Sequence, residues 1–176
     1  PRGAAIAAAS VIAFFAFLRK SNLTVGRIRA TSEFTHAVTA GNVWVDYSTY
    51  TLYVRLTCTK TIQFGERTLI IPVQGMPGSP IDPVALLEKH LRSSELPRQP
   101  NAHAFAYQTA PGSPWSDLTH TTFVTHVKDA ARRFGFDPAK YAAHSFRRGG
   151  ATFAAACGVS PDMIKALGDW RSDAYQ

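Results

Sequence analysis

The first apolar stretch of the chain runs from Gly3 to Leu18 and contains no charged residue. It resembles a signal-peptide core or a short membrane span. However, its sixteen residues would rise only about 24 Å as a helix, short of the roughly 30 Å hydrocarbon core. We therefore predict a helix that is buried on most sides and extends to about Leu23. A polar turn closes it, with the residues Arg19, Lys20, Ser21 and Asn22.

The pattern then changes to short runs of β-branched and aromatic residues between Val43 and Val73. The runs read VWV, TLYVRLT and TLIIPV, and the polar stretches 46–49 and 63–67 separate them. Runs of this length and composition with turn residues between them are typical of strands. We predict three strands in an antiparallel meander.

Helical signals dominate the second half of the chain. Asp82-Pro83 supplies an N-cap acceptor and a proline at the first helical position, so it opens a helix over PVALLEKHLR. The Pro- and Ser-rich stretch 93–115 predicts a loop with one short strand at 103–107. Thr119 then caps a helix that ends at Gly135. Its apolar residues recur every three or four positions, namely Phe123, Val124, Val127, Ala130, Ala131 and Phe134.

Two further helices follow the Asp137-Pro138 turn. Ser145 is predicted to open the first of them, which runs through Ala156 and closes at Gly158. The second starts at the pair 160–161, Ser followed by Pro, and stops at Gly168. The sum is an α+β domain that is mostly helical, with a small three-stranded antiparallel sheet between its first and later helices.

Composition narrows the function classes. A chain of 176 residues predicts one domain, and 45% hydrophobic with 18% charged residues excludes a disordered chain. Lys and Arg outnumber acidic residues by 19 to 12, and the resulting net charge of +7 favours a polyanionic partner. Cys58 and Cys157 lack the spacing of a disulfide scaffold or a zinc ribbon, so we expect a reducing compartment and not a secreted protein.

The densest polar cluster is YAAHSFRRGGAT. His144 and Arg147 stand three positions apart at a helix start and so share one face, with Arg148 beside them. Free N–H groups and the helix dipole make such a terminus suitable for a phosphate. The pair Gly149 and Gly150, costly inside a helix, indicates close approach by another backbone or by a ligand. The alternative is a satisfied core histidine with two solvated arginines.

Three more residues stand out. Arg19 directly follows the apolar run without an acidic neighbour, so it needs a partner, either a bound phosphate or a carboxylate from elsewhere in the fold. Lys60 lies where a strand enters a hairpin turn, where a lysine is either solvated or able to protonate a leaving group. Trp170 follows a helix-terminating glycine and offers one indole N–H donor.

The order of these segments resembles the catalytic domain of tyrosine recombinases, the DNA breaking and rejoining enzymes that include phage integrases. The resemblance runs from about Ile12 to Gln176. More narrowly, KTIQFGER, HSFRRGGATFAAACG and LGDWRSDAYQ look like the recombinases of Crypton and DIRS mobile elements. The resemblance to tyrosine recombinases implies five catalytic residues: Arg19 in LRKSNL, Lys60 in TKTIQFGER, His144 and Arg147 in HSFRRGGAT, and Trp170 in LGDW.

The chain departs from the family pattern at two places. The family often carries an acidic residue three positions after the first arginine, where this chain has Asn22. Asp169 competes with Trp170 for the fifth role. In relatives the attacking tyrosine lies about nine residues past this position, so we expect the nucleophile just beyond Gln176 and regard Tyr175 as a weak candidate.

The resemblance also implies how such a domain works. The two arginines would bind the non-bridging phosphate oxygens, Lys60 would protonate the departing 5′ oxygen with help from His144, and the product would be a 3′-phosphotyrosine link. Neither a metal nor a cofactor is required. Double-stranded DNA would be the partner, held in part by Arg148 and Lys20 through phosphate contacts.

The resemblance further implies an incomplete chain. It begins at Pro1 without an initiator Met, so we expect a catalytic-domain fragment, residues 1–176, that lacks an N-terminal core-binding domain and the nucleophile segment. Such enzymes act as tetramers on paired DNA sites and are not membrane proteins. A eukaryotic mobile element would place the protein in the nucleus, and any other source in the cytoplasm.

Competing interpretations remain open. Ala154, Gly158 and Ile164 have the spacing of a helix-turn-helix, but its recognition helix PDMIKAL offers few side chains to base edges. A domesticated recombinase that binds DNA without cutting it is a further alternative. A metal site from His120 and His126 is the weakest interpretation, because residues six apart do not share a helical face.

Overall fold

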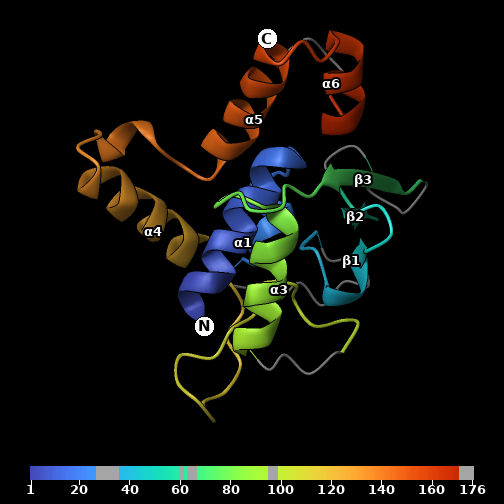
Figure 1. Ribbon diagram of the computed structural model, residues 1–176. Coiled ribbons are helices and arrows are strands. Elements are labelled where there is room, and N and C mark those ends of the chain that lie inside the picture. Colours follow the sequence, from blue (N-terminus) through green and yellow to red (C-terminus); the bar gives the residue numbers. More distant parts are fainter. Residues whose placement is uncertain (27–35, 60–61, 63–66, 95–98, 171–176) are drawn as a thin grey trace.

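The computed structural model describes residues 1–26, 36–59, 62, 67–94 and 99–170. Helices and a small sheet alternate along them (Figure 1). In chain order the elements are α1 (Arg2–Phe15), α2 (Lys20–Leu23), η1 (Ala40–Asn42), β1 (Val43–Asp46), β2 (Thr51–Leu56), β3 (Leu69–Gln74), α3 (Pro83–Ser94), α4 (His120–Arg133), η2 (Pro138–Lys140), α5 (His144–Ala156) and α6 (Pro161–Gly168). The predicted α+β class is confirmed.

Helix α1 lies at the centre of the molecule, in contact with α3 and with α5 (Figure 1). Its small residues explain this position, because alanines let neighbouring helices approach closely. The buried residues of α1 are Ala5, Ala8, Ala9, Ile12 and Ala13. The predicted burial is therefore confirmed. None of the helices in the described ranges has the length and apolar character needed to cross a membrane.

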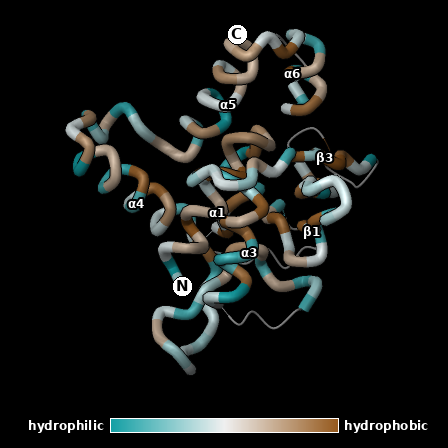
Figure 2. The backbone as a smooth tube through the Cα atoms, viewed as in Figure 1, coloured by the Kyte–Doolittle hydropathy of each residue, from teal (hydrophilic) through white to brown (hydrophobic). Residues whose placement is uncertain are grey.

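The sheet is antiparallel throughout, with the order β1-β2-β3. Val54 on the central strand lies opposite Val43 on one side and Ile71 on the other. Alternate residues of β2 and β3 are buried in the core. Figure 2 colours parts of the tube brown, for hydrophobic residues, along β1 and β3. The predicted meander is confirmed.

Local capping chemistry sets most helix ends. Asp82, Thr119 and Ser160 each accept a hydrogen bond from a backbone N–H of the first turn of α3, α4 and α6, at 3.0, 3.2 and 3.3 Å respectively. Gly135 and Gly158 close α4 and α5 with φ of 77° and 82°, a left-handed conformation that glycine adopts without cost. These five predictions are confirmed.

The predicted end of the first helix is wrong. Helix α1 stops at Phe15, and α2 is a separate short helix. Between them Phe17 has φ of 49°, a left-handed conformation that is rare for an aromatic residue. The turn places Arg19 at the N-cap of α2 instead of on the surface of a longer α1.

Two other local predictions are wrong. The stretch 103–107 forms single bridges to neighbouring loops, Thr39–His103 and Tyr107–Ser116, and no strand. Helix α5 begins at His144, because the hydroxyl of Ser145 accepts a hydrogen bond from the preceding loop at Ala142 (3.0 Å) instead of capping the helix.

The apolar face of α4 is only partly buried. Phe123 and Ala131 are buried, whereas Ala130 is exposed and Phe134 is 78% exposed. Phe134 lies past the last helical residue, where the chain turns at Gly135, so its side chain leaves the helical stripe. The periodicity therefore predicted the helix correctly and its burial only in part.

Burial of His103 makes the stability of the fold depend on pH. Its Nε2 donates to the Leu23 carbonyl (3.1 Å), while Nδ1 is buried without a partner among the described residues. Burial lowers the pKa of His103 from 6.5 to about 4, although Asp117 and the Leu23 bond act in the opposite direction and His90 adds to the decrease. The native state thus resists protonation.

We expect this histidine to cost the protein about 3 kcal/mol of unfolding free energy as the pH falls from 6.5 to 4. In that window the unfolded chain binds a proton that the native state does not bind. Urea unfolding at both pH values should show a smaller decrease in the free energy of unfolding for His103→Gln than for the wild type. The amide of the glutamine can still donate to Leu23. Equal decreases in the two proteins would contradict the assignment.

Candidate phosphate-binding site

Arg19 is held by the chain that follows α6. Its Nη2 donates to the backbone carbonyl of Asp169 (3.0 Å), and Nη1 lies 3.5 Å from the Asp169 carboxylate, 150 positions away in the sequence. The side chain remains 20% exposed. Of the two partners expected for Arg19, the structure provides the carboxylate.

Arg147 projects from the first turns of α5 and is only 4% exposed. Its guanidinium donates to the carbonyls of Phe17 and Gly168, the latter at 2.6 Å, and stacks on the Trp170 ring with 3.8 Å between Cζ and the ring centroid. Burial, together with the nearby Arg19, lowers its pKa to about 9, against the opposite effect of Asp169. Arg147 therefore stays charged at neutral pH.

One tight turn, residues 168–170, holds both arginines. Gly168 and Trp170 contact Arg147, and Asp169 contacts Arg19. Asp169 has φ of 53°, and a Cβ at Gly168 would lie 1.5 Å from the Trp170 ring. Only glycine fits there, because the ring packs directly against the Gly168 backbone.

His144 lies beside these arginines at the exposed N-terminus of α5. Desolvation lowers its pKa, and the positive charges of Arg147, Arg148 and Arg19 lower it further. The imidazole is therefore neutral at neutral pH and can accept a proton. The alternative of a core histidine does not fit this exposure.

Neither the role of Asp169 nor the participation of Arg67 was evident from the sequence. The buried Asp169 carboxylate accepts hydrogen bonds from Thr59 (Oγ1 to Oδ2, 3.1 Å) and from the Arg67 guanidinium. Thr59 follows β2 and Arg67 precedes β3. The lack of an acidic neighbour for Arg19 was the signal that Arg19 needs a distant anionic partner, and a carboxylate from elsewhere in the fold was one of the two expected partners.

Asn22 forms hydrogen bonds that hold the backbone around Arg19. Its buried amide donates to the carbonyls of His36 (2.9 Å) and Cys58 (3.3 Å) and accepts from the Arg19 backbone N–H (3.3 Å). An aspartate could not donate both of these bonds. Asn22 thus fixes the backbone at Arg19, and its side chain is not the partner of the Arg19 guanidinium.

Other predicted residues lie around or outside this cluster. Arg148 is exposed next to Arg147 in the sequence, and Lys20 is exposed next to Arg19. Lys60 and Tyr175 lie outside the described residues. Within the described ranges, no group of three or more His, Cys, Asp or Glu side chains is placed to hold a metal ion, and His120 and His126 belong to no such group.

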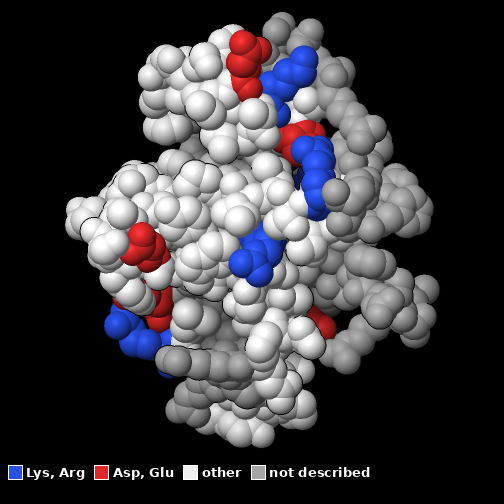
Figure 3. All heavy atoms as spheres, turned by 90° about the vertical axis from the view of Figure 1, so that its right-hand side faces the viewer, with Lys and Arg blue, Asp and Glu red and all other residues white. Residues whose placement is uncertain are grey.

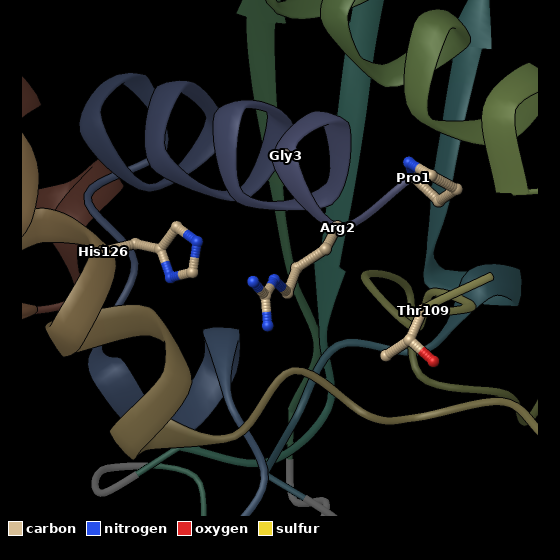
Figure 4. A pocket seen from close by; sticks show the side chains of 5 residues that line it. All are labelled: Pro1, Arg2, Gly3, Thr109 and His126. Carbon is tan, nitrogen blue, oxygen red and sulfur yellow. The ribbon is translucent and has the colours of Figure 1, made fainter.

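Two further features of the surface are its mixed charge and a separate pocket. Figure 3, which views the side of the sheet and α6, shows Lys and Arg side chains interspersed with acidic ones. A pocket lies at the N-terminal end of α1, where the Arg2 side chain extends between Thr109 and His126 (Figure 4). The site formed by Arg19 and Arg147 lies past the opposite end of α1, so this pocket lies on a different part of the surface.

No protein-family model matches the sequence, and no curated protein matches it. The chain is similar to known proteins in its three-dimensional structure. The XerH site-specific recombinase, bound to its difH substrate in a pre-cleavage complex, superposes on 97% of this chain and 41% of its own length, with a TM-score of 0.66 and 15% identity.

The Tn1549 transposon integrase in complex with circular intermediate DNA gives a TM-score of 0.51 at 11% identity, over 94% of this chain and 50% of that one. A second complex of that integrase gives 0.52 at 10% identity. The chain thus spans about half or less of the length of these proteins. At such identities the likeness is one of fold, and the chain has the fold of a tyrosine recombinase catalytic domain.

Proposed function

We propose that this chain is the catalytic domain of a tyrosine recombinase that cleaves and rejoins DNA. The observation that carries the proposal is the convergence of Arg19 and Arg147 on one turn, with His144 beside them. Two guanidiniums and an imidazole from distant segments match the charge of a phosphodiester in its transition state.

Double-stranded DNA is the proposed substrate. The net charge of +7 favours a polyanion, and the XerH and Tn1549 proteins of the same fold were both solved with DNA. The exposed Arg148 and Lys20 are the chain neighbours of the buried Arg147 and the partly exposed Arg19, and they would contact neighbouring phosphates. Binding of this kind weakens steeply with salt.

Each site residue then has a chemical role. Arg147, fixed by two carbonyls and the Trp170 ring, and Arg19 would stabilise the charge that grows on the non-bridging oxygens without reorganising. The neutral His144 would take part in proton transfer, and Lys60 would protonate the departing 5′ oxygen. Trp170 would act mainly through Arg147, against which its ring packs.

The remaining steps would depend on residues outside the described part of the chain. A tyrosine just past Gln176, with Tyr175 as the weaker candidate, would attack the phosphate and form a 3′-phosphotyrosine link. An N-terminal core-binding domain would complete the DNA clamp, consistent with the partial coverage of the two neighbours. We propose a tetramer on paired sites, an origin in a Crypton or DIRS type element, and action in the nucleus.

Covalent capture tests the function. The full-length protein would be incubated with a library of short random-sequence duplexes that carry a nick, and denaturing gels would reveal any protein joined to DNA. We expect a linked species whose tyrosine is identified by mass spectrometry. Binding that persists without any linked species would refute cleavage and favour the domesticated, DNA-binding alternative.

A further inference from the structure

The carboxylate of Asp169 joins three separate parts of the molecule. Its Oδ2 accepts from Thr59 (3.1 Å) and lies 3.5 Å from Nη1 of Arg19, while Oδ1 accepts from Arg67. The side chain is 6% exposed, so these charges interact with little solvent between them. The end of β2, the start of β3 and the N-cap of α2 therefore meet at one carboxylate.

An ionised carboxylate cannot bind a phosphate directly. It has no hydrogen to donate, and its charge repels a phosphate oxygen. Asp169 is nevertheless located between Arg19 and the backbone that holds Arg147. Its effect on the reaction must therefore pass through the arginines.

The arginines need such a group. Arg19 and Arg147 repel each other strongly enough to contribute to the lowered pKa of Arg147, whereas Asp169 acts in the opposite sense. Without a negative charge nearby, the partly exposed Arg19 would move toward solvent, because a guanidinium on a flexible stem gains entropy and hydration there. The Asp169 carboxylate opposes that movement.

We propose that Asp169 is a positioning residue that holds Arg19, and with it Arg67, in the geometry that receives the phosphate. The kinetic consequence of this role rests on the proposed function, whereas the positioning of Arg19 by the Asp169 carboxylate does not depend on it. It differs from the role of a phosphate donor at this position, which Asp169 cannot fill. Arg67 becomes a member of the site through the same carboxylate.

Removal of the charge should separate binding from chemistry. In Asp169→Asn the site loses a negative charge, so affinity for duplex DNA should stay the same or become tighter. A displaced Arg19 should slow covalent capture at saturating DNA by about 10²-fold, the effect of a misplacement near 1 Å. A purely structural role would instead lower both quantities together or neither.

The experiment compares Asp169→Asn with Asp162→Asn in the full-length protein. Asn tolerates the left-handed backbone conformation of position 169 as well as Asp does, so the turn should survive. Asp162 is exposed on α6 and loses the same charge, which makes it the matched control. Duplex affinity and the rate of capture would be measured on the nicked random-sequence library.

A second measurement does not depend on catalysis. Side-chain NMR of the Arg19 guanidinium, assigned with Arg19→Lys, should give a lower order parameter in Asp169→Asn than in wild type or Asp162→Asn. An unchanged order parameter would overturn the positioning role, as would a parallel loss of affinity and capture. If wild type captures no DNA while Arg19 still loosens in Asp169→Asn, the recombinase function fails and the positioning role survives.

Discussion

Replacement of Arg147 by lysine is expected to reduce covalent DNA capture by about 10²- to 10³-fold while duplex binding is largely retained. Lysine keeps a cation but loses the planar fork that donates to Phe17 and Gly168 and stacks on Trp170. A single ammonium cannot hold that position and contact a phosphate at the same time. Binding should persist because most of it comes from the exposed cations.

The neighbouring residue gives the matched control. Arg148 is exposed one position further along α5, so Arg148→Ala should weaken binding, reduce the salt dependence by about one phosphate contact and leave capture unchanged at saturating DNA. Thermal unfolding would verify that Arg147→Lys is folded, since each buried carbonyl left without a donor costs about 1–3 kcal/mol. Parallel loss of binding and capture in a folded Arg147→Lys protein would contradict the transition-state role.

Local chemistry explains why most elements could be predicted. A cap such as Thr119 or Ser160 and a terminator such as Gly135 act within four residues of themselves, so they are visible in the sequence. The strands were equally visible, because β-branched runs between polar turns have few other uses. The prediction of close approach at Gly150 also succeeded, since a glycine is costly inside a helix unless another group needs the space.

Long-range contacts explain what could not be predicted. The left-handed Phe17 has no local signal, because its conformation is stabilised by a hydrogen bond from Arg147, 130 positions away. The choice of Asp169 as the partner of Arg19 likewise depends on the fold. The sequence could state that Arg19 needed an anion, but only the tertiary structure could show that the carboxylate lies inside the site itself.

The two arginines also depend on the contact between α1 and α5, which makes that contact the most sensitive part of the scaffold. Phe17, whose carbonyl accepts from Arg147, and Arg19 both follow directly from the end of α1. Arg147 and His144 occupy the start of α5. A change in the distance between the two helices therefore moves one half of the site relative to the other.

Gly150→Ala is expected to lower the free energy of unfolding by about 3 kcal/mol or more. A Cβ at Gly150 would lie 1.9 Å from the backbone oxygen of Phe14 and 3.0 Å from the ring of Phe17. A backbone oxygen in the last turn of α1 cannot rotate away, so α1 and α5 must separate. The Arg147 bond to Phe17 should then break, and sulfate binding measured by calorimetry should weaken together with stability.

Gly149→Ala separates this steric effect from the general effect of alanine in a helix. Its Cβ would meet only the edge of the Phe14 ring, at 3.3 Å, and a ring can shift by the few tenths of an ångström required. Alanine also favours a helix over glycine by up to about 1 kcal/mol, so Gly149→Ala should be neutral or stabilising. Urea unfolding should thus place the two variants at least about 3 kcal/mol apart, although they are adjacent and chemically identical. Equal stabilities would mean that α5 can move away from α1 at little cost, and the two halves of the phosphate site would then not be held together by this contact.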